Sequence, residues 1–383
     1  MEVNKRQKEI IQLIENLDIS PTMYKNAVEK YEAITRYLQG HGFNADMYPQ
    51  GSFALGTVVR PRKDNKDANY DLDFICQVKK ARDETTATML WKELKEVLEK
   101  SPYADNLVKD DKCFTIEYAD INGVGFSIDI VPAADESVER KLKLKSESEH
   151  PYLIDTSIVL PDTSRDRSMW VTNNPKGYRA WFENINEPYR RYSKEEYRRA
   201  LFEKHSTFYS SIEAIPVELE RSSIQRVIQI LKKHRDEFYA KCKYRKPISA
   251  IIGTLVAKIA ENQPPYLSVF ELLEKVLITL CNHSRNDEML YKENGKWKIP
   301  NPANPDDNLA DSWNDDTCDK FFSWINQAKI DLIDALSYED EKFQAFMENA
   351  FGLEFIKKHW GDKYRPVRPK PIHPSNAPKP WGN

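Results

Sequence analysis

The chain contains 383 residues, of which 40% are hydrophobic and 11% aromatic, which is typical of a soluble globular protein of about two domains. Charged residues make up 31% of the chain, but the formal net charge is only −3. This balance argues against indiscriminate binding to long nucleic acids, which requires a strongly basic surface.

Signals for export or membrane insertion are not found in the sequence. Residues 1–10 are charged throughout and contain no apolar segment, so no signal peptide is expected. The longest apolar run, over residues 248–260, is too short to cross a bilayer. The five cysteines are scattered, and none has zinc-ligand spacing with a histidine. We therefore expect a reduced, cytoplasmic protein with no zinc site and no membrane association.

Hydrophobic periodicity predicts mixed helices and strands in the first half of the chain. Residues 4–40 predict a helix that restarts at Ser20-Pro21. The next predicted elements are a strand, turn and strand over residues 47–78, a helix over 92–100, and strands over 114–118 and 124–131. Residues 132–134 are expected to end the sheet, and residues 135–175 to be irregular.

From Tyr178 onward the pattern becomes mostly helical. The predicted helices cover residues 177–182, 194–205, 222–240, 248–262, 267–281, 320–336 and 341–360. Proline recurs through residues 366–380, which predicts an extended, disordered tail with partial polyproline II character. We place one domain over residues 1–165, a second over residues 166–365, and the tail over residues 366–383.

Three aspartates occupy two of the predicted strands. Side chains at i and i+2 of a strand share a face, so Asp71 and Asp73 point together while Leu72 enters the core, and Asp129 behaves likewise on its own strand. Converging carboxylates repel one another unless a cation lies between them, and Mg²⁺ held by carboxylates and substrate phosphates fits this pattern. Solvent-facing acids on an edge strand are the alternative, but the apolar flanks indicate interior strands. The pattern therefore predicts a metal-dependent nucleotidyl-transfer site.

The tripeptide Gln50-Gly51-Ser52 precedes the acidic strand. A Gly-Ser pair usually marks a plain turn. Its position favours a further role, because glycine lets the backbone approach a phosphate closely and serine adds a hydroxyl and an N–H donor. We predict that this turn holds the β- and γ-phosphates of a nucleotide.

The predicted helix near residues 222–236 carries a polar stripe of Gln225, Gln229 and Lys232 beside its apolar stripe. A solvated helix face is the simplest interpretation. The alternative is that Lys232 faces the Gly-Ser turn and binds the triphosphate, with Lys233 as the second candidate.

Two further positions have both a structural and a functional interpretation. Ser249 follows Pro247 at a predicted helix start, where a hydroxyl and free N–H groups can cap the helix, bind an anion, or do both. Asn174 lies at the end of the expected irregular segment, where it forms a turn or contacts the edge of a nucleobase.

These segments resemble the DNA polymerase β-type nucleotidyltransferase superfamily. More narrowly, they resemble the cGAS/DncV-like nucleotidyltransferases (CD-NTases), the bacterial cyclic-oligonucleotide synthases of anti-phage defence (CBASS). The resemblance is carried by residues 51–57 (GSFALGT), 70–73 (YDLD), 127–132 (SIDIVP), 174–182 (NPKGYRAWF), 225–232 (QRVIQILK), 246–249 (KPIS) and 301–311 (NPANPDDNLAD). It therefore extends over nearly the whole chain.

The resemblance implies an α+β fold, with a polymerase β-like core built on a mixed sheet and an all-helical second domain like that of oligoadenylate synthases. It implies that Asp71, Asp73 and Asp129 are catalytic and bind two Mg²⁺ ions, for which Mn²⁺ can substitute. The donor triphosphate would be held by Gly51, Ser52, Lys232 and Ser249. The segment over residues 301–311 would be structural.

The activity implied by the resemblance is the joining of NTPs (ATP, another NTP, or both) into a cyclic di- or trinucleotide second messenger, with release of pyrophosphate. A linear 2′-5′ oligonucleotide synthase or a nucleotidyl-tagging enzyme is the enzymatic alternative. A silent nucleotide sensor is the non-enzymatic alternative, against which the intact aspartate set argues. The nucleobases, the ring size and the linkage stay open.

The resemblance also bears on regulation. The zinc-binding DNA-sensing insert of the animal enzyme is absent, so activation by nucleic acid is not expected. Residues 53–70 are a longer gap than many polymerase β-type enzymes have, which makes residues 60–69 a candidate lid. In some operons of the family, ubiquitin-like machinery conjugates the synthase through its C-terminal residue. Such conjugation at Asn383, or regulation by proteins of the same operon, is therefore an expectation here.

Overall fold

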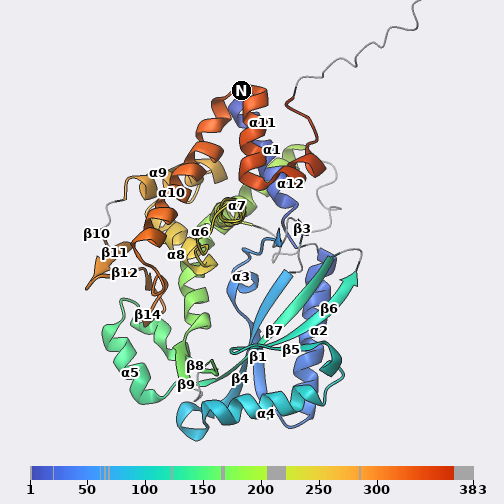
Figure 1. The fold of residues 1–383 in the computed structure, drawn as a ribbon, viewed down its shortest axis with the longest axis vertical. Coiled ribbons are helices and arrows are strands. Elements are labelled where there is room, and N and C mark those ends of the chain that lie inside the picture. Colours follow the sequence, from blue (N-terminus) through green and yellow to red (C-terminus); the bar gives the residue numbers. More distant parts are fainter. Residues whose placement is uncertain are drawn as a thin grey trace, which may run out of the picture.

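The structure, a computed structural model, describes residues 2–19, 21–60, 62–63, 66–67, 70–121, 124–164, 169–204, 221–283 and 286–365. The candidate lid lies largely outside these ranges, and the tail over residues 366–383 lies wholly outside them. The chain forms a sheet half and a helical half, and the long helix α6 (Pro175–Lys204) runs from one to the other (Figure 1).

A mixed sheet forms the first half. Its strands are β1 (Ala45–Pro49), β4 (Tyr70–Ala81), β5 (Leu107–Lys109), β6 (Phe114–Ile121), β7 (Val124–Asp135), β8 (Ile158–Asp162) and β9 (Met169–Asn173). They are ordered β1-β4-β7-β6-β5, with β8 pairing to both β7 and β9. β4 and β7 are parallel, whereas the other pairs are antiparallel. The two strands that carry the aspartates are therefore neighbours.

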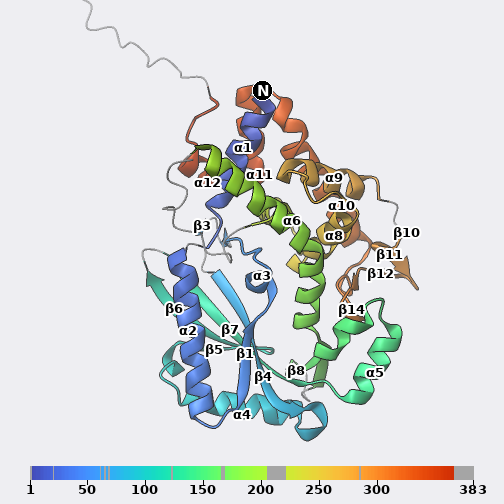
Figure 2. The same cartoon turned by 180° about the vertical axis from the view of Figure 1, so that it is seen from behind.

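Helices α2 (Pro21–Gly40) and α4 (Ala87–Glu99) pack on one face of this sheet (Figure 2). Every second residue of the central strands points into that layer, and Leu72, Phe74 and Ile128 are fully buried there. The residues between them lie on the opposite face. The alternation predicted from the sequence thus places all three aspartates on one face of the sheet.

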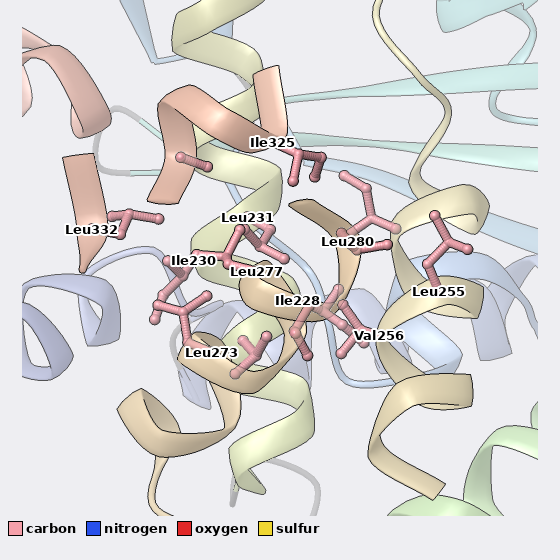
Figure 3. Packing of buried hydrophobic residues seen from close by; sticks show 14 of the residues in the cluster. Ile228, Ile230, Leu231, Leu255, Val256, Leu273, Leu277, Leu280, Ile325 and Leu332 are labelled. Carbon is pink, nitrogen blue, oxygen red and sulfur yellow. The ribbon is translucent and has the colours of Figure 1, made fainter. Parts of the chain in front are cut away.

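The second half packs around one central helix. Its main helices are α7 (Ser223–Tyr239), α8 (Ser249–Glu261), α9 (Val269–Cys281), α10 (Asp315–Leu332), α11 (Asp340–Phe351) and α12 (Leu353–His359). Figure 3 shows Ile228, Ile230 and Leu231 of α7 among side chains from α8, α9 and α10. Burial on nearly every side fixes the rotation of α7, and thereby the direction in which its polar side chains point.

The mixed α+β fold is confirmed, but the second half also contains short strands. These are β10 (Asn286–Asp287), β11 (Leu290–Glu293), β12 (Lys296–Lys298), β13 (Pro300–Asn301) and β14 (Asn304–Asn308). The Asn308 amide bonds the backbone of Ile299, Ala310 and Trp297, so this part of the resembling segment holds a turn together.

Three sequence predictions about element boundaries are wrong. Residues 135–175 are not irregular, because they contain α5 (Val138–Glu147), β8 and β9. Strand β7 continues to Asp135, past the point where we expected it to end. The two helices expected around residues 177–205 are one helix, α6, with Pro188 inside it. Helix α5 was not predicted because its sequence is mostly charged and only Leu144 is buried, so the apolar spacing that indicates a helix is weak.

Helix α1 (Glu2–Glu15), which we assigned to the first domain, packs with the second half. Ile10 and Leu13 belong to the core of the helical half, and Arg6 donates to the carbonyl oxygens of Leu336 and Tyr338 at 2.8 and 2.6 Å. An apolar stripe predicts that a helix is covered, but not which partner covers it. Within the described residues, no helix has both the length and the apolar character needed to cross a membrane.

Candidate active site

The three aspartates form one group on the sheet. Asp73 and Asp129 lie opposite each other in the register of β4 and β7, and Asp71 lies opposite Ser127 two residues earlier. Burial, followed by the charges of Asp129 and Asp71, raises the pKa of Asp73 to about 7. Burial also raises the pKa of Asp129. The local structure therefore concentrates negative charge where it is poorly solvated, and a cation bound there would relieve the repulsion.

The Gly-Ser turn lies directly against this group. The Gln50 N–H donates to the carbonyl oxygen of Asp73 at 2.9 Å, which ties the turn to β4. Gly51 has a φ of +59°, and a Cβ atom added there would lie 3.0 Å from Asp73 Oδ2. The backbone conformation therefore favours glycine at this position, and a larger residue would also require the Asp73 carboxylate to shift.

A lysine from the helical half approaches the same turn. Lys232 is buried, and its Nζ donates to the carbonyl oxygen of Thr57 at 2.8 Å. Burial, followed by the charge of Arg235, lowers the pKa of Lys232 to about 7. Lys233, the second candidate, pairs instead with Glu237 at 2.7 Å and is buried in the helical half. The structure thus favours Lys232 over Lys233.

A cleft of about 460 Å³ between the sheet and the helices α7 and α8 is lined by five of the predicted site residues, Ser52, Asp71, Asp73, Lys232 and Ser249. Its polar lining is Ser52, Asp71, Asp73, Lys232, Arg235, Asp236, Arg245, Lys246 and Ser249. Asp129, Gln50 and Gly51 do not line the cleft itself, but they contact or adjoin Asp73. Acidic groups thus come from the sheet and mostly basic groups from the helices, which is an arrangement suited to a metal-bound polyphosphate.

Sequence reasoning missed Arg235, although it follows Lys232 by one helical turn. Its Nη1 donates to the Ser249 hydroxyl oxygen at 3.2 Å and to the Pro247 carbonyl oxygen at 3.0 Å. Because arginine only donates, the Ser249 oxygen accepts in this contact, and the hydroxyl can still donate its own hydrogen to another acceptor. Arg235 therefore fixes Ser249 at the start of α8, where that serine lines the cleft.

The structure does not support Asn174 as a base contact. It is buried, and its Oδ1 accepts from the Gly177 N–H at 3.0 Å and from the Thr156 hydroxyl at 2.8 Å. Its Nδ2 donates to the carbonyl oxygens of Leu153 and Ala303, both at 2.9 Å. These four bonds use the side chain fully. Asn174 instead anchors the start of α6 between the two halves.

We expect Asn174→Ala to lower the free energy of unfolding by about 1–3 kcal/mol, because it leaves buried donors and acceptors unsatisfied. The KM for each nucleotide should be unchanged. Thermal unfolding and steady-state kinetics check this, with Asn106→Ala, which changes an exposed asparagine, as the control. A rise in the KM for one nucleotide alone, with unchanged stability, would restore the base-contact interpretation.

The donor set at the aspartates fits a hard divalent cation, because carboxylate oxygens are the ligands that Mg²⁺ and Mn²⁺ prefer. In the part of the chain that the structure describes, no group of three or more His, Cys, Asp or Glu side chains is arranged to hold a metal ion. Ions held at the aspartates would need water and substrate phosphates to complete their coordination.

The chain is similar to known proteins over most of its length. Residues 1–186 match the Second Messenger Oligonucleotide or Dinucleotide Synthetase domain family (SMODS). The chain is 25% identical over 360 residues to a "c-di-GMP synthase" of Roseivirga ehrenbergii, covering 91% of this chain and 85% of that protein. It is 24% identical over 318 residues to the "Cyclic dinucleotide synthase CdnG" of Bradyrhizobium diazoefficiens, covering 79% and 69% respectively.

The fold is also similar to that of a solved structure. The CD-NTase CdnG of Bradyrhizobium diazoefficiens in complex with GTP superposes with a TM-score of 0.66 at 20% identity. The match covers 91% of this chain and 96% of that one. Both halves of the chain therefore have counterparts in one known architecture.

Proposed function

Because this chain belongs to the cGAS/DncV-like nucleotidyltransferases, through its Second Messenger Oligonucleotide or Dinucleotide Synthetase domain, we propose that it joins NTPs into a cyclic di- or trinucleotide second messenger and releases pyrophosphate. The observation that carries this proposal is the cleft in which aspartates on the sheet face Lys232 and its basic neighbours on α7 and in the α7–α8 connection. A cyclic product is favoured over a linear one by the cyclic dinucleotide synthases among its relatives.

Divalent cations belong to this proposal. Asp71, Asp73 and Asp129 would hold two Mg²⁺ ions, for which Mn²⁺ would substitute. When bound, such ions lower the pKa of the acceptor ribose hydroxyl and neutralise the leaving pyrophosphate. The convergence of the carboxylates on one face of the sheet and the raised pKa of Asp73 support this assignment.

The residues of the chain would bind and orient the substrates. Gly51 and Ser52 offer backbone N–H groups and a hydroxyl to the β- and γ-phosphates, and Lys232 and Ser249 contact the same triphosphate from the helical half. The acceptor hydroxyl then attacks the α-phosphorus in line, so that most of the catalysis comes from positioning and electrostatics. Asp129 would help to deprotonate the acceptor hydroxyl.

Ring formation requires the same cleft to act more than once. The first bond yields a linear intermediate that still carries a 5′-triphosphate. That intermediate would reorient so that its triphosphate occupies the site by Lys232 while its terminal hydroxyl faces Asp129.

A role in anti-phage signalling, together with regulatory partners from the same operon, is the biological context that we propose. Conjugation at the C-terminal residue stays a prediction, since residues 366–383 lie outside the described part of the chain.

Product analysis tests the proposal. Purified protein is incubated with all four NTPs, each α-labelled in turn, and with Mg²⁺ or Mn²⁺, and the products are then treated with phosphatase. We expect a labelled species that resists phosphatase and has the mass of a cyclic oligonucleotide, and we expect EDTA to abolish it. Linear products with free ends would instead support the 2′-5′ synthase or the tagging enzyme.

A further inference from the structure

Two hydroxyl side chains lie in the same rows of the sheet as the aspartates. In one row, Asp73 of β4, Asp129 of β7 and Thr115 of β6 are neighbours. In the adjacent row, Asp71 of β4 lies beside Ser127 of β7. Each row therefore pairs a hydroxyl with a carboxylate on the face that we assign to catalysis.

Thr115 contacts one oxygen of Asp129. Its Oγ1 donates to Asp129 Oδ1 at 2.6 Å. A carboxylate that accepts a short hydrogen bond at one oxygen is held in one rotamer, and its other oxygen is left for another ligand. The partner comes from a separate strand, so the position of the carboxylate is fixed by the pairing of β6 with β7.

Ser127 contacts Asp71 in the same way. Its Oγ donates to Asp71 Oδ1 at 2.9 Å, across the parallel pair of β4 and β7. Ser127 is buried with 8% of its surface exposed, whereas Asp71 is exposed. A buried hydroxyl thus restrains an exposed carboxylate that would otherwise sample several rotamers.

Asp73 is restrained by other means. No hydrogen bond to its carboxylate is recorded among the described residues, but Gly51 lies close to its Oδ2 and the Gln50 N–H bonds its carbonyl oxygen. The central carboxylate is therefore confined by the Gly-Ser turn. The two outer carboxylates are each confined by one hydroxyl.

We propose that Thr115 and Ser127 are positioning residues, which hold Asp129 and Asp71 with one oxygen each turned toward a divalent cation. This inference rests on the proposed function, because it assumes that the aspartates bind the ion. Neither hydroxyl contacts substrate in this account. Partners of metal ligands typically contribute about 10–100-fold to metal affinity.

Mn²⁺ affinity of the nucleotide-free full-length protein, measured by electron paramagnetic resonance, tests the inference without requiring turnover. Thr115→Val keeps the shape of the side chain and removes the hydroxyl, and Ser127→Ala removes the second hydroxyl. We expect each to weaken Mn²⁺ binding by about 10–100-fold. Thr115→Ser retains the hydroxyl and should stay within about threefold of the wild type, which is below the range expected for losing such a partner.

The melting temperature in EDTA separates positioning from folding. Variants that bind Mn²⁺ weakly but melt within a few degrees of the wild type support the inference. Equal Mn²⁺ affinity of Thr115→Val and the wild type would overturn it, as would a Thr115→Ser variant that loses as much affinity as Thr115→Val. If the wild-type protein itself binds no Mn²⁺, the proposed function fails, and this inference fails with it.

Discussion

Asp73→Asn should abolish nucleotidyl transfer and at the same time stabilise the metal-free protein. The loss of activity should be at least about 10³-fold, because the substitution removes a charge that is needed when the transition state forms. The gain in stability has a separate cause. Asp73 lies opposite Asp129 in the sheet, and burial with two like charges raises its pKa to about 7.

The sign of this effect follows from the raised pKa. In the unfolded chain the carboxyl ionises near its ordinary pKa of 3.8, whereas in the folded chain it retains its proton up to about pH 7. Folding stability therefore falls as the pH rises between these values, and the full cost applies above pH 7. At pH 8 the asparagine variant should be more stable in EDTA by on the order of 1–3 kcal/mol, after allowance for solvent screening.

Two controls sharpen this test. Asp46→Asn changes an exposed carboxylate on the neighbouring strand β1 and should alter neither property. Added Mn²⁺ should raise the melting temperature of the wild type but not that of Asp73→Asn. An Asp73→Asn protein with full activity would favour the silent-sensor interpretation over the enzyme.

Lys232→Met should weaken NTP binding by roughly 10–100-fold, since a hydrogen bond to a charged group contributes about 1.5–3 kcal/mol. Methionine keeps most of the buried volume, so the loss reports on the charge rather than on packing. The KM should rise more than kcat falls, because the lysine contacts the triphosphate in both the ground state and the transition state. Steady-state kinetics with each substrate NTP measures this.

The same lysine predicts proton uptake on binding. Burial and Arg235 lower the pKa of Lys232 to about 7, so the side chain is largely neutral in the empty cleft at pH 8. A triphosphate favours the charged form, so the site should take up a proton when the nucleotide binds. Calorimetry in buffers of different ionisation enthalpy should detect the uptake in the wild type and not in Lys232→Met.

Lys233→Met and Lys275→Met are the matched controls for this position. Lys233 is paired with Glu237 within the helical half, so its replacement should lower stability without changing the KM. Lys275 is exposed on α9, and its replacement should change neither. If Lys233→Met raised the KM as much as Lys232→Met, the assignment of the phosphate contact would be wrong.

The alternation of apolar and acidic residues, together with the Gly-Ser turn, made the central strands predictable from the sequence. The alternation of Leu72 and Phe74 with two aspartates required a strand with one buried face, and the register of β4 with β7 brought Asp73 opposite Asp129. The partner of α1 was not predictable, because the contacts of Arg6 with residues near 336–340 depend on the complete fold. Helix α5 was missed because most of its surface faces solvent.

Some residues of the candidate site were likewise predictable from the sequence, and others were not. The aspartates and the Gly-Ser turn lie in short segments, and the spacing of their residues was enough to predict that they belong to the site. Arg235 and Thr115 act through side-chain contacts across elements, with Ser249 of α8 and Asp129 of β7, and these contacts leave no local signature in the sequence. Asn174 shows the reverse error, since a polar residue near a turn was given a ligand contact although its buried amide is used entirely by the fold.

The ratio of pyrophosphate released to nucleotide incorporated tests the central claim most directly. Closing a ring of any size releases one pyrophosphate for every nucleotide incorporated, because no 5′-triphosphate remains in the product. A linear dinucleotide releases only half as much, since its first nucleotide keeps its triphosphate. We predict a ratio of one for the wild-type protein and no release above background for Asp73→Asn. A ratio clearly below one, such as the one half of a linear dinucleotide, or equal release by the two proteins, would contradict the account.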